Sequence, residues 1–383
     1  MKIGIVAGEA SGDLLGADLI RAIKSEYPNA EFLGLAGPLM QKQGAVSLAE
    51  MEKISIMGIA GVIKSLFELI AIRRTIKKKM LAWRPDVFVG IDVPDFNLGL
   101  EVQLKEAGIP TVHYVSPTVW AWRGHRIHKI RRAVNLMLTL FPFEETYYRK
   151  HKIAVKFVGH PLAQEVLAWR ANEKLRNKLN VDPSKRLVAL LPGSRMSEVS
   201  RLAPIMLEAA AQLLARRSDI QFVIPAANAK IRDYLEPLVH EMLGKQVPVE
   251  MVVVEGHSRD VLSLCHCVAL ASGTAALEAA MFAKPMVVMY KVAKMEEWYA
   301  ARTMQVEHFS MPNHLLNPPP VPELIQDNAT TENLLLELVK LLDEPDYYAE
   351  LEQKLATIRP ALSLDSSQLA CAAIVALAGK QKN

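Results

Sequence analysis

The stretch KIGIVAGEASGDLLG, residues 2–16, contains the pattern that decides the fold of this protein. A short apolar run, Ile3–Ala7, ends in small residues and leads directly into a segment with helical character. Continuous apolar runs of this kind are typical of parallel strands that are buried on both faces and joined by helices. We therefore expect a strand, a tight turn and a helix at this position.

The same pattern recurs along the chain in two series. The first continues at residues 87–92, 111–115 and 136–141, and the second runs through 187–191, 222–224, 252–254, 268–270 and 286–289. Two series predict an α/β protein with two Rossmann-like parallel-sheet domains. We expect these domains at 1–160 and 161–345, with a helical tail at 346–383 that returns to the first domain. Ligands gather at the carboxyl ends of parallel strands, so we expect the active site in the cleft that the two sheets face.

Composition excludes several classes of protein. The formal charge of +4 and the 6% aromatic content argue against a nucleic-acid-binding protein. No secretory pattern precedes the first apolar run, and three cysteines cannot form a disulfide framework. The CHC stretch at 265–267 is too tightly spaced for the usual zinc site and runs into an apolar strand, so we expect core packing there. We expect a cytoplasmic protein that binds neither a metal nor a cofactor.

The turn after the first predicted strand, residues 7–16, is suited to an anion. Its small residues let the backbone approach a ligand, and the next helix points free N–H groups at it. The turn is neither a GxGxxG fingerprint nor a P-loop, which makes an NAD-dependent dehydrogenase the least favoured enzyme. The alternative is a plain strand-to-helix turn in which Asp13 begins the helix.

Two more loops of this kind lie in the second domain. LPGSRMSE (191–198) includes Arg195, whose guanidinium matches phosphate geometry. ASGTAALE (271–278) ends in Glu278, which can accept the hydroxyls of a ribose. Each loop alone could be a helix cap, but two in one sheet predict a site for a diphosphate and a ribose. The residues assigned to it are Gly193, Ser194, Arg195, Glu198, Ser272, Gly273, Thr274 and Glu278.

GIDVPDFN (90–97) places two carboxylates at the end of a strand in the first domain. Asp92 follows the apolar run directly and is expected to face the cleft, which suits a general base. Asp95 follows a proline and is more easily a solvated turn residue. Asp13 is the rival base.

Aromatic and basic residues concentrate in YVSPTVWAWRGHRIHKIRR (114–132). Two tryptophans and several cations can hold an acidic amphiphile. The alternative is a helix packed on its neighbour with a solvated basic face.

The segment after Gly58 predicts contact with a membrane surface. Its apolar residues share one helical face and lead into a cationic cluster, as in peripheral membrane helices. The alternative is a helix buried on its own sheet with a basic end in solvent. The residues assigned to the contact are Ile59, Val62, Ile63, Leu66, Phe67, Ile70, Arg73 and Lys77.

Taken in order, these motifs closely resemble those of the lipid-A-disaccharide synthases, which are membrane-associated bacterial glycosyltransferases. The resemblance rests on VAGEASGD (6–13), GIDVPDFN (90–97), HYVSP (113–117), WAWR (120–123), LPGSR (191–195) and ASGT (271–274). These motifs run through both predicted domains. The resemblance implies a GT-B architecture that binds the donor on the second domain and the acceptor on the first.

The resemblance also implies the substrates. A diacylated glucosamine is transferred from UDP to the 6-hydroxyl of diacylated glucosamine 1-phosphate, with inversion, to give a β-1,6 bond. It implies an enzyme on the cytoplasmic face of a Gram-negative inner membrane, in contact with anionic lipid, and a homodimer that exchanges C-terminal segments. The acceptor-binding residues are then Gly8, Glu9, Ser11, Gly12, Ser116, Trp120, Arg123 and Asn313.

Family and residues together suggest a mechanism. Asp92 draws the proton from the acceptor hydroxyl, while Arg195 and the helix N-termini stabilise the departing UDP without a metal. No acidic pair of the Asp-x-Asp kind accompanies the phosphate loops in the sequence. The rival hypotheses are a UDP-N-acetylglucosamine 2-epimerase, which has no use for the apolar and basic stripe, and a membrane-docked protein that binds nucleotide-sugar without catalysis.

Overall fold

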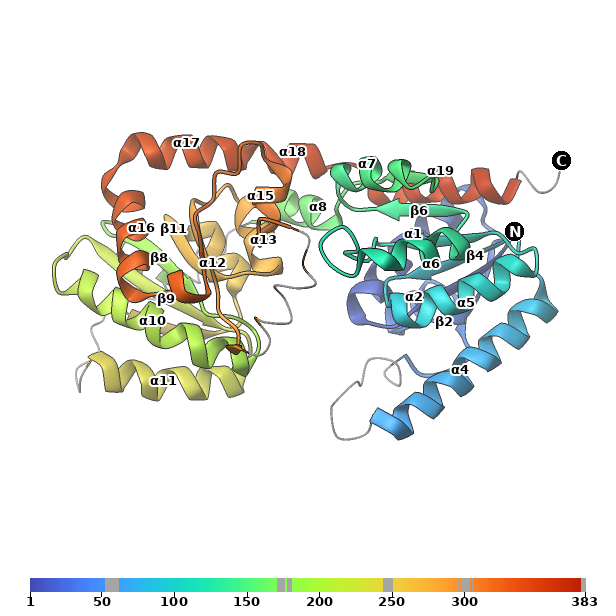
Figure 1. The fold of residues 1–383 in the computed structure, drawn as a ribbon, viewed down its shortest axis with the longest axis horizontal. Coiled ribbons are helices and arrows are strands. Elements are labelled where there is room, and N and C mark those ends of the chain that lie inside the picture. Colours follow the sequence, from blue (N-terminus) through green and yellow to red (C-terminus); the bar gives the residue numbers. More distant parts are fainter. Residues whose placement is uncertain are drawn as a thin grey trace. The chain divides into compact units, whose positions relative to one another are not determined.

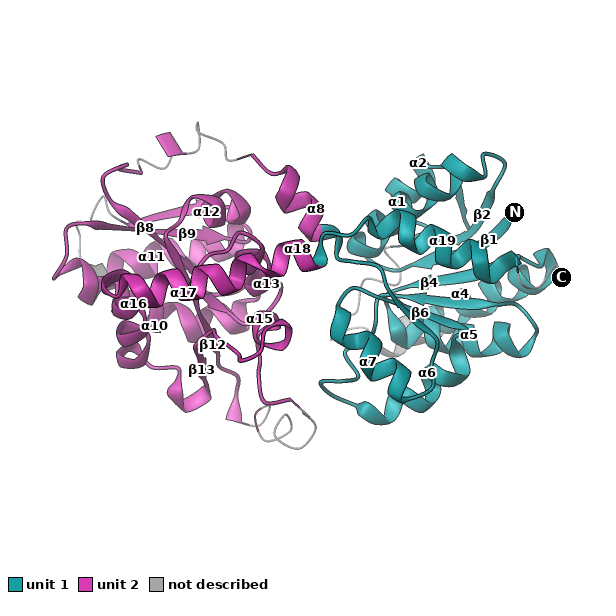
Figure 2. Cartoon of the chain, turned by 90° about the horizontal axis from the view of Figure 1, so that it is seen from above, with its two compact units in different colours: residues 1–161, 362–383 teal, residues 162–361 magenta. Residues whose placement is uncertain are grey.

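The computed structural model of the chain consists of two compact α/β units. Unit 1 contains Met1–Pro161 and Leu362–Asn383, and unit 2 contains Leu162–Ala361 (Figure 2). The structure describes residues 1–51, 62–170, 176–177, 181–243, 251–294, 297, 304 and 306–379. Each unit is built on one parallel sheet with helices packed on it (Figure 1).

Unit 1 has a seven-stranded sheet in the order β3-β2-β1-β4-β5-β6-β7. Its strands are β1 (Lys2–Ala7), β2 (Glu31–Leu35), β3 (Ala45–Ser47), β4 (Val87–Ile91), β5 (Thr111–Tyr114), β6 (Leu136–Thr139) and β7 (Val155–Phe157). Its helices are α1 (Ala10–Glu26), α2 (Pro38–Lys42), α4 (Val62–Trp83), α5 (Pro94–Glu106), α6 (Ile127–Ala133), α7 (Pro142–Lys150) and α19 (Ser366–Gly379), with a 3₁₀ turn η2 (Gly124–Arg126).

Alternating residues of the central strands supply two separate cores in unit 1. On one face of the sheet, Ile5 belongs to a cluster with residues of α1 and with Ile374 of α19. On the other face, Phe88 packs with Ile76 of α4 and Leu100 of α5. Because both faces are covered, the strands are apolar throughout, which is why they could be recognised as continuous runs.

Unit 2 has a six-stranded sheet in the order β10-β9-β8-β11-β12-β13. Its strands are β8 (Arg186–Leu191), β9 (Ile220–Ala226), β10 (Met251–Glu255), β11 (Cys267–Ala271), β12 (Met286–Tyr290) and β13 (Glu323–Ile325). Its helices, with the two at its boundaries, are α8 (Pro161–Ala168), α10 (Met196–Leu214), α11 (Ala229–Leu243), α12 (Ser258–Leu264), α13 (Thr274–Met281), α15 (Met311–Leu315), α16 (Thr331–Asp343), α17 (Pro345–Ala356) and α18 (Ile358–Leu362), with a 3₁₀ turn η3 (Gln326–Asn328).

Each sheet reverses its strand order once. In unit 1, β1 pairs with β2 on one side and with β4 on the other. In unit 2, β8 lies in the same way between β9 and β11. The chain leaves such a pair of strands in opposite directions, so the loops after them part and open a crevice at the carboxyl edge of the sheet.

The predicted α/β class with two parallel sheets is confirmed, but some elements differ from expectation. The strands β2, β3 and β13 escaped prediction because they are short, and Gly34 interrupts the apolar pattern of β2. The C-terminal return begins at Leu362 and not at 346. Helix α17 stays with unit 2, where its apolar residues Leu351 and Leu355 are buried.

One stretch of the described residues, Pro345–Gly379, passes the length and composition test for a membrane-crossing helix, because an 18-residue window within it has a mean hydropathy of 1.5. The structure divides it into α17, α18 and α19. Leu355 is buried in unit 2, whereas Cys371 and Ile374 are buried in unit 1. These apolar side chains therefore contribute to the cores of the two units.

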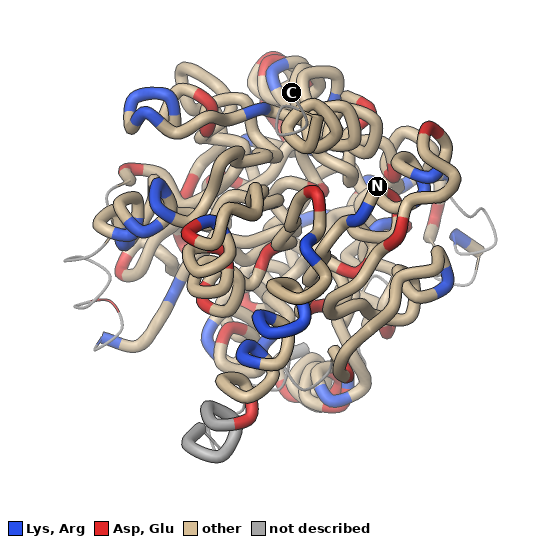
Figure 3. The backbone as a smooth tube through the Cα atoms, turned by 90° about the vertical axis from the view of Figure 1, so that its right-hand side faces the viewer, with Lys and Arg blue, Asp and Glu red and all other residues tan. Residues whose placement is uncertain are grey.

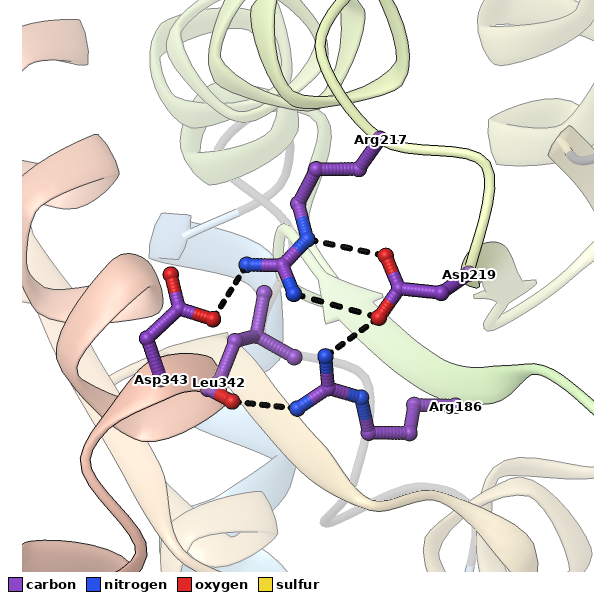
Figure 4. Close-up of polar contacts among 5 residues, drawn as sticks. All are labelled: Arg186, Arg217, Asp219, Leu342 and Asp343. Atoms are coloured by element: carbon purple, nitrogen blue, oxygen red, sulfur yellow. Dashed lines mark hydrogen bonds and ion pairs between the residues drawn. The ribbon is translucent and has the colours of Figure 1, made fainter.

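A charged cluster ties the start of β8 and β9 to the end of α16 (Figure 4). Asp219 accepts a hydrogen bond from Nε of Arg217 at 2.9 Å and also pairs with Arg186. Arg217 contacts Asp343 at 2.6 Å, and Arg186 donates to the carbonyl oxygen of Leu342. A carboxylate shared by two arginines forms a network, and networks stabilise more than isolated surface pairs do.

Replacing Asp219 with asparagine should lower the free energy of unfolding at neutral pH by on the order of 1 kcal/mol, after allowance for solvent screening. Hydrogen bonds from Arg217 and Arg186 hold the pKa of Asp219 well below its usual range. The carboxylate therefore stabilises the fold above the ordinary aspartate pKa and loses that effect as the pH falls below it. Urea melts at several pH values should show the deficit shrink in acid. An equal deficit at every pH would contradict this account.

Candidate active site

The crevice at the β8/β11 reversal contains a pocket of about 280 Å³ within unit 2. It is lined by seven of the eight residues predicted to bind the donor, namely Gly193, Ser194, Glu198, Ser272, Gly273, Thr274 and Glu278. The eighth, Arg195, stands at the N-cap of α10 with its side chain 77% exposed. Two loops that are 80 residues apart in sequence thus meet where the sheet reverses its order.

The loop after β8 has the geometry of an anion site. Gly193 has φ 126°, and a Cβ there would lie 2.7 Å from the Cβ of Glu198. The carboxylate of Glu198 accepts a hydrogen bond from the Ser194 backbone N–H at 3.3 Å and from Nη1 of Arg195 at 2.8 Å. An N–H at a helix start and a guanidinium are the donors that bind phosphate, and here they already hold a negative group.

The loop after β11 and the helix that follows it are held by contacts with other segments of unit 2. The Ser272 hydroxyl donates to the carbonyl oxygen of Phe309 at 2.7 Å. Glu278 accepts from Nε of Arg259 at 3.2 Å, and Arg259 also contacts Glu165 at 2.6 Å. Arg259 therefore orients the carboxylate that lines the pocket and that we expected to bind a ribose.

Five further residues of the pocket wall were not predicted from the sequence. Pro225 and Ala226 end β9 and Ala227 follows it, while Gly256 and Ser258 follow β10. These residues are small or apolar and match no phosphate motif. Their positions after two predicted strands were the available signal, because every strand of a parallel sheet ends at the same edge.

Unit 1 has its own pocket, of about 320 Å³, beside the ends of β4 and β5. Asp92, Ser116 and Arg123 line it, together with Pro94, Asp95, Val115, Pro117, Thr118, Val119, Trp122 and Arg126. Arg123 lies over the ring of Trp122, with 4.3 Å between the guanidinium carbon and the ring centroid. A carboxylate and a cation therefore face the same space.

The structure separates the two candidate bases. Asp92 lines the pocket, whereas Asp13 is only 2% exposed. The two oxygens of Asp13 accept hydrogen bonds from the backbone N–H groups of Leu39 and Met40, at 2.9 and 3.0 Å. These bonds give Asp13 a structural role at the start of α2, and Asp92 is the better candidate base.

A buried polar cluster supports the loop between β5 and α6. Ser116 shares a hydrogen bond of 2.8 Å with the Tyr148 hydroxyl. The buried carboxylate of Glu144 accepts from Nε1 of Trp120 at 3.1 Å and from the backbone N–H of Phe141 at 3.2 Å. Burial raises the pKa of Glu144 to about 7, against the opposing hydrogen bonds. Ser116 therefore lines the pocket directly, whereas Trp120 is not in its described lining and helps to hold the loop in place.

The remaining residues assigned to the acceptor are not found in the described lining of this pocket. Gly8 and Glu9 form the turn from β1 into α1, and Ser11 and Gly12 lie in the first turn of α1. Asn313 is buried in unit 2. Its Nδ2 donates to the carbonyl oxygen of Val321 and to the Glu323 carboxylate at 2.8 Å, and its Oδ1 accepts from the backbone N–H of Val321. Asn313 fixes its own loop, so its side chain has a structural role.

The residues assigned to membrane contact are described only in part. Ile59 and the side chains of Val62, Ile63, Leu66 and Phe67 lie outside the described residues. Basic and acidic positions are interspersed along the backbone, as Figure 3 shows. Arg73 donates to the carbonyl oxygen of Asp95 at 2.9 Å, and its guanidinium carbon lies 5.0 Å from the ring centroid of Phe96. Its side chain therefore packs on helix α5 of the same unit. Ile70 and Lys77 are half-buried.

The CHC stretch is part of the core, as predicted. Cys265 and Cys267 are buried, and burial raises the pKa of the Cys265 thiol to about 12. The ring of His266 stacks on Tyr348 with 4.2 Å between centroids. Within the described residues, no group of three or more His, Cys, Asp or Glu side chains is arranged to hold a metal.

Comparison with known proteins decides the family. The family model described as lipid-A-disaccharide synthetase matches residues 3–373. The chain belongs to the lipid-A-disaccharide synthetase family. It is 44% identical over 382 residues to a lipid-A-disaccharide synthase of Pseudomonas fluorescens, covering 100% of this chain and 99% of that protein. It is 48% identical over 343 residues to a synthase of Hahella chejuensis, covering 90% and 86%. The predicted resemblance is confirmed.

Solved structures place this member of the lipid-A-disaccharide synthetase family in the GT-B fold. A UDP-N-acetylglucosamine 2-epimerase of Neisseria meningitidis has a TM-score of 0.61 at 12% identity, with each chain covered completely. A glycosyltransferase of Rickettsia africae has a TM-score of 0.61 at 11% identity, covering 100% of this chain and 98% of that one. At this identity the likeness is one of fold, and the epimerase likeness is therefore no argument for epimerase activity.

In this family member, Glu144 should make stability depend on pH. The folded state keeps the Glu144 proton up to about pH 7, whereas the unfolded chain loses it near 4.5. The free energy of unfolding should therefore fall as the pH rises through this window, by on the order of 3 kcal/mol from this group. In urea melts, Glu144→Gln should remove this fall of the free energy of unfolding with pH. The exposed control Glu350→Gln should keep it. An unchanged slope in Glu144→Gln would assign the effect to another group.

Proposed function

We propose that the protein is a lipid-A-disaccharide synthase. It transfers a diacylated glucosamine from UDP to the 6-hydroxyl of diacylated glucosamine 1-phosphate and forms a β-1,6 bond with inversion. Membership of the family supports the activity, and the pocket at the β8/β11 reversal supports a nucleotide-linked donor. The observation that carries the proposal is that Ser194 and Arg195 hold a carboxylate where a diphosphate would bind.

Unit 2 binds the donor in this proposal. The diphosphate replaces the Glu198 carboxylate at the start of α10 and also meets the N-terminus of α13 behind Gly273. Glu278, oriented by Arg259, accepts the ribose hydroxyls. As the bond from C1 to the diphosphate breaks, the electron pair goes to the departing UDP, and Arg195 stabilises the added charge without a metal.

Unit 1 binds the acceptor. Asp92 takes the proton of the 6-hydroxyl as the hydroxyl oxygen attacks C1 of the donor. Arg123 forms no ion pair in the part of the chain that the structure describes, so it is available for the acceptor phosphate. Attack from the face opposite the leaving group gives inversion. The reaction requires unit 2 to bring C1 of the donor to Asp92.

The lipid chains of both substrates require a membrane surface. Helix α4 carries exposed Arg74, Lys78 and Lys79, which suit anionic headgroups. The apolar sequence that precedes them, from Ile59 to Ile70, suits insertion between those headgroups. We therefore propose peripheral binding to the cytoplasmic face of the inner membrane through this helix. The homodimer stays a prediction from the family resemblance.

A direct assay tests the proposal. Purified protein is incubated with UDP-2,3-diacylglucosamine and 2,3-diacylglucosamine 1-phosphate in detergent micelles, and the disaccharide and UDP are measured. We expect equal amounts of the two products. Epimerisation of UDP-N-acetylglucosamine, or binding of UDP without turnover, would instead support one of the rival hypotheses.

Replacing Asp92 with asparagine should reduce kcat by about 10²- to 10⁴-fold, because the acceptor hydroxyl then lacks a base. The affinity for UDP, measured by calorimetry, should not change, since Asp92 lies in unit 1 and the donor pocket in unit 2. The exposed Glu106→Gln, at the far end of the helix α5 that follows Asp92, is the matched control. Turnover close to that of the control would remove Asp92 from the mechanism.

Replacing Arg195 with alanine should lower the rate by about 10²-fold or more, as expected when one preorganised donor to a developing charge is lost. Arg201→Ala is the control, because Arg201 lies on α10, the helix that Arg195 caps, and among the described residues donates to the carbonyl oxygen of Ser197. Steady-state kinetics of the two variants would separate a specific role from a general loss of positive charge. Equal rates would show that Arg195 has no role in catalysis.

A further inference from the structure

The turn that carries Asp92 has an unfavourable backbone. Asp92 and Val93 both lie in the left-handed region, with φ of 51° and 44°. Residues other than glycine avoid this region, and a β-branched residue such as Val93 is a genuine outlier there. Surrounding structure must therefore impose this conformation, and such strain gathers at functional sites.

The side chain of Asn97 is bound to this turn. Asn97 is fully buried on the first turn of α5, and its Nδ2 donates to the carbonyl oxygens of Asp92 at 2.8 Å and Ile91 at 3.3 Å. Two acceptors require a donor, so the amide nitrogen must face the turn. The backbone N–H of Asp92 is meanwhile bound to the carbonyl oxygen of Tyr114 at 2.8 Å. The turn is thus held from the sheet on one side and from Asn97 on the other.

A second layer of buried groups holds Asn97 in place. A Cβ on Gly90 would lie 3.0 Å from the Cβ and Cγ of Asn97, and 2.2 Å from Oε1 of Glu101. Only a glycine at residue 90 leaves room for both side chains. Glu101 lies one helical turn further along α5 and contacts Nδ1 of His113 at 2.8 Å, with both side chains fully buried. Gly90 therefore lies against both Asn97 and the Glu101 carboxylate that is paired with His113.

We propose that Asn97 is a positioning residue, whose side-chain amide holds the Asp92 turn in the conformation that places the Asp92 carboxylate in the unit 1 pocket. This inference rests on the proposed role of Asp92 as the base. Asn97 touches no substrate, and its effect passes through the backbone of residues 91–93. Loss of the bond should misplace the base and leave substrate binding intact.

The test compares Asn97→Asp with the wild type in the disaccharide assay. Aspartate has the same size but offers no donor to the two carbonyl oxygens. We expect kcat to fall about 10²-fold, as for a reacting group displaced by about 1 Å, with KM for both substrates within about twofold of the wild type. Asn97→Ser is smaller and uncharged, can donate to one carbonyl only, and should lower kcat less; it also serves if the aspartate variant does not fold.

Leu104→Ala is the matched structural control. Leu104 is fully buried at the far end of the same helix, so its truncation destabilises α5 without touching the turn. At a temperature well below both melting midpoints, Leu104→Ala should keep the kcat of the wild type. A fall in kcat no larger for the Asn97 variants than for Leu104→Ala, or a rise in KM in place of a fall in kcat, would overturn the proposal.

A second-site change provides the rescue. Val93→Gly makes the left-handed conformation accessible without support, so adding it to Asn97→Asp should restore part of kcat, about 5- to 10-fold. The same change added to Leu104→Ala should restore nothing. Absence of any recovery in Asn97→Asp would count against positioning through the turn. Wild-type protein that makes no disaccharide would instead defeat the proposed function, independently of Asn97.

Discussion

Pairing of two strands that the chain leaves in opposite directions opens the pocket of unit 2. Where β8 meets β11, the loops that follow cannot cover the sheet edge because their helices lie on opposite faces. Backbone N–H groups and short polar side chains then line the opening without competition from a hydrophobic core. The pocket of unit 1 depends on the same constraint in a simpler form, because the neighbouring parallel strands β4 and β5 end at one edge of their sheet.

The pocket of unit 1 depends on buried polar groups that a purely hydrophobic core would exclude. Glu144 lies under the loop of Trp120, and the pair formed by Glu101 and His113 lies under the turn of Asp92. Burying a carboxylate costs free energy unless hydrogen bonds offset the loss of water. In return, directional bonds fix a loop more narrowly than apolar contacts do, because a small displacement breaks them.

The sequence identified the parts of the fold that depend on long apolar runs and glycine-containing turns. The loops at 191–198 and 271–278 were predicted as one site, and seven of their eight assigned residues line one pocket. The sequence could not reveal that both oxygens of Asp13 accept hydrogen bonds from α2, because that helix is distant from Asp13 in the sequence. It also could not reveal that Asn313 holds its own loop, because the loop is irregular. Tertiary hydrogen bonds leave no periodic signal, whereas buried strands do.

The return of the chain to unit 1 has a consequence for synthesis on the ribosome. Ala370, Cys371 and Ile374 of α19 belong to the same hydrophobic cluster as Ile3 and Ile5 of β1. Translation delivers β1 first and α19 after the whole of unit 2. The first unit to emerge is therefore the last to be completed, the reverse of the usual N-terminal-first order. Until residue 374 leaves the exit tunnel, the nascent chain lacks the α19 side chains that pack on β1 and α1, and premature termination within unit 2 leaves those apolar residues uncovered.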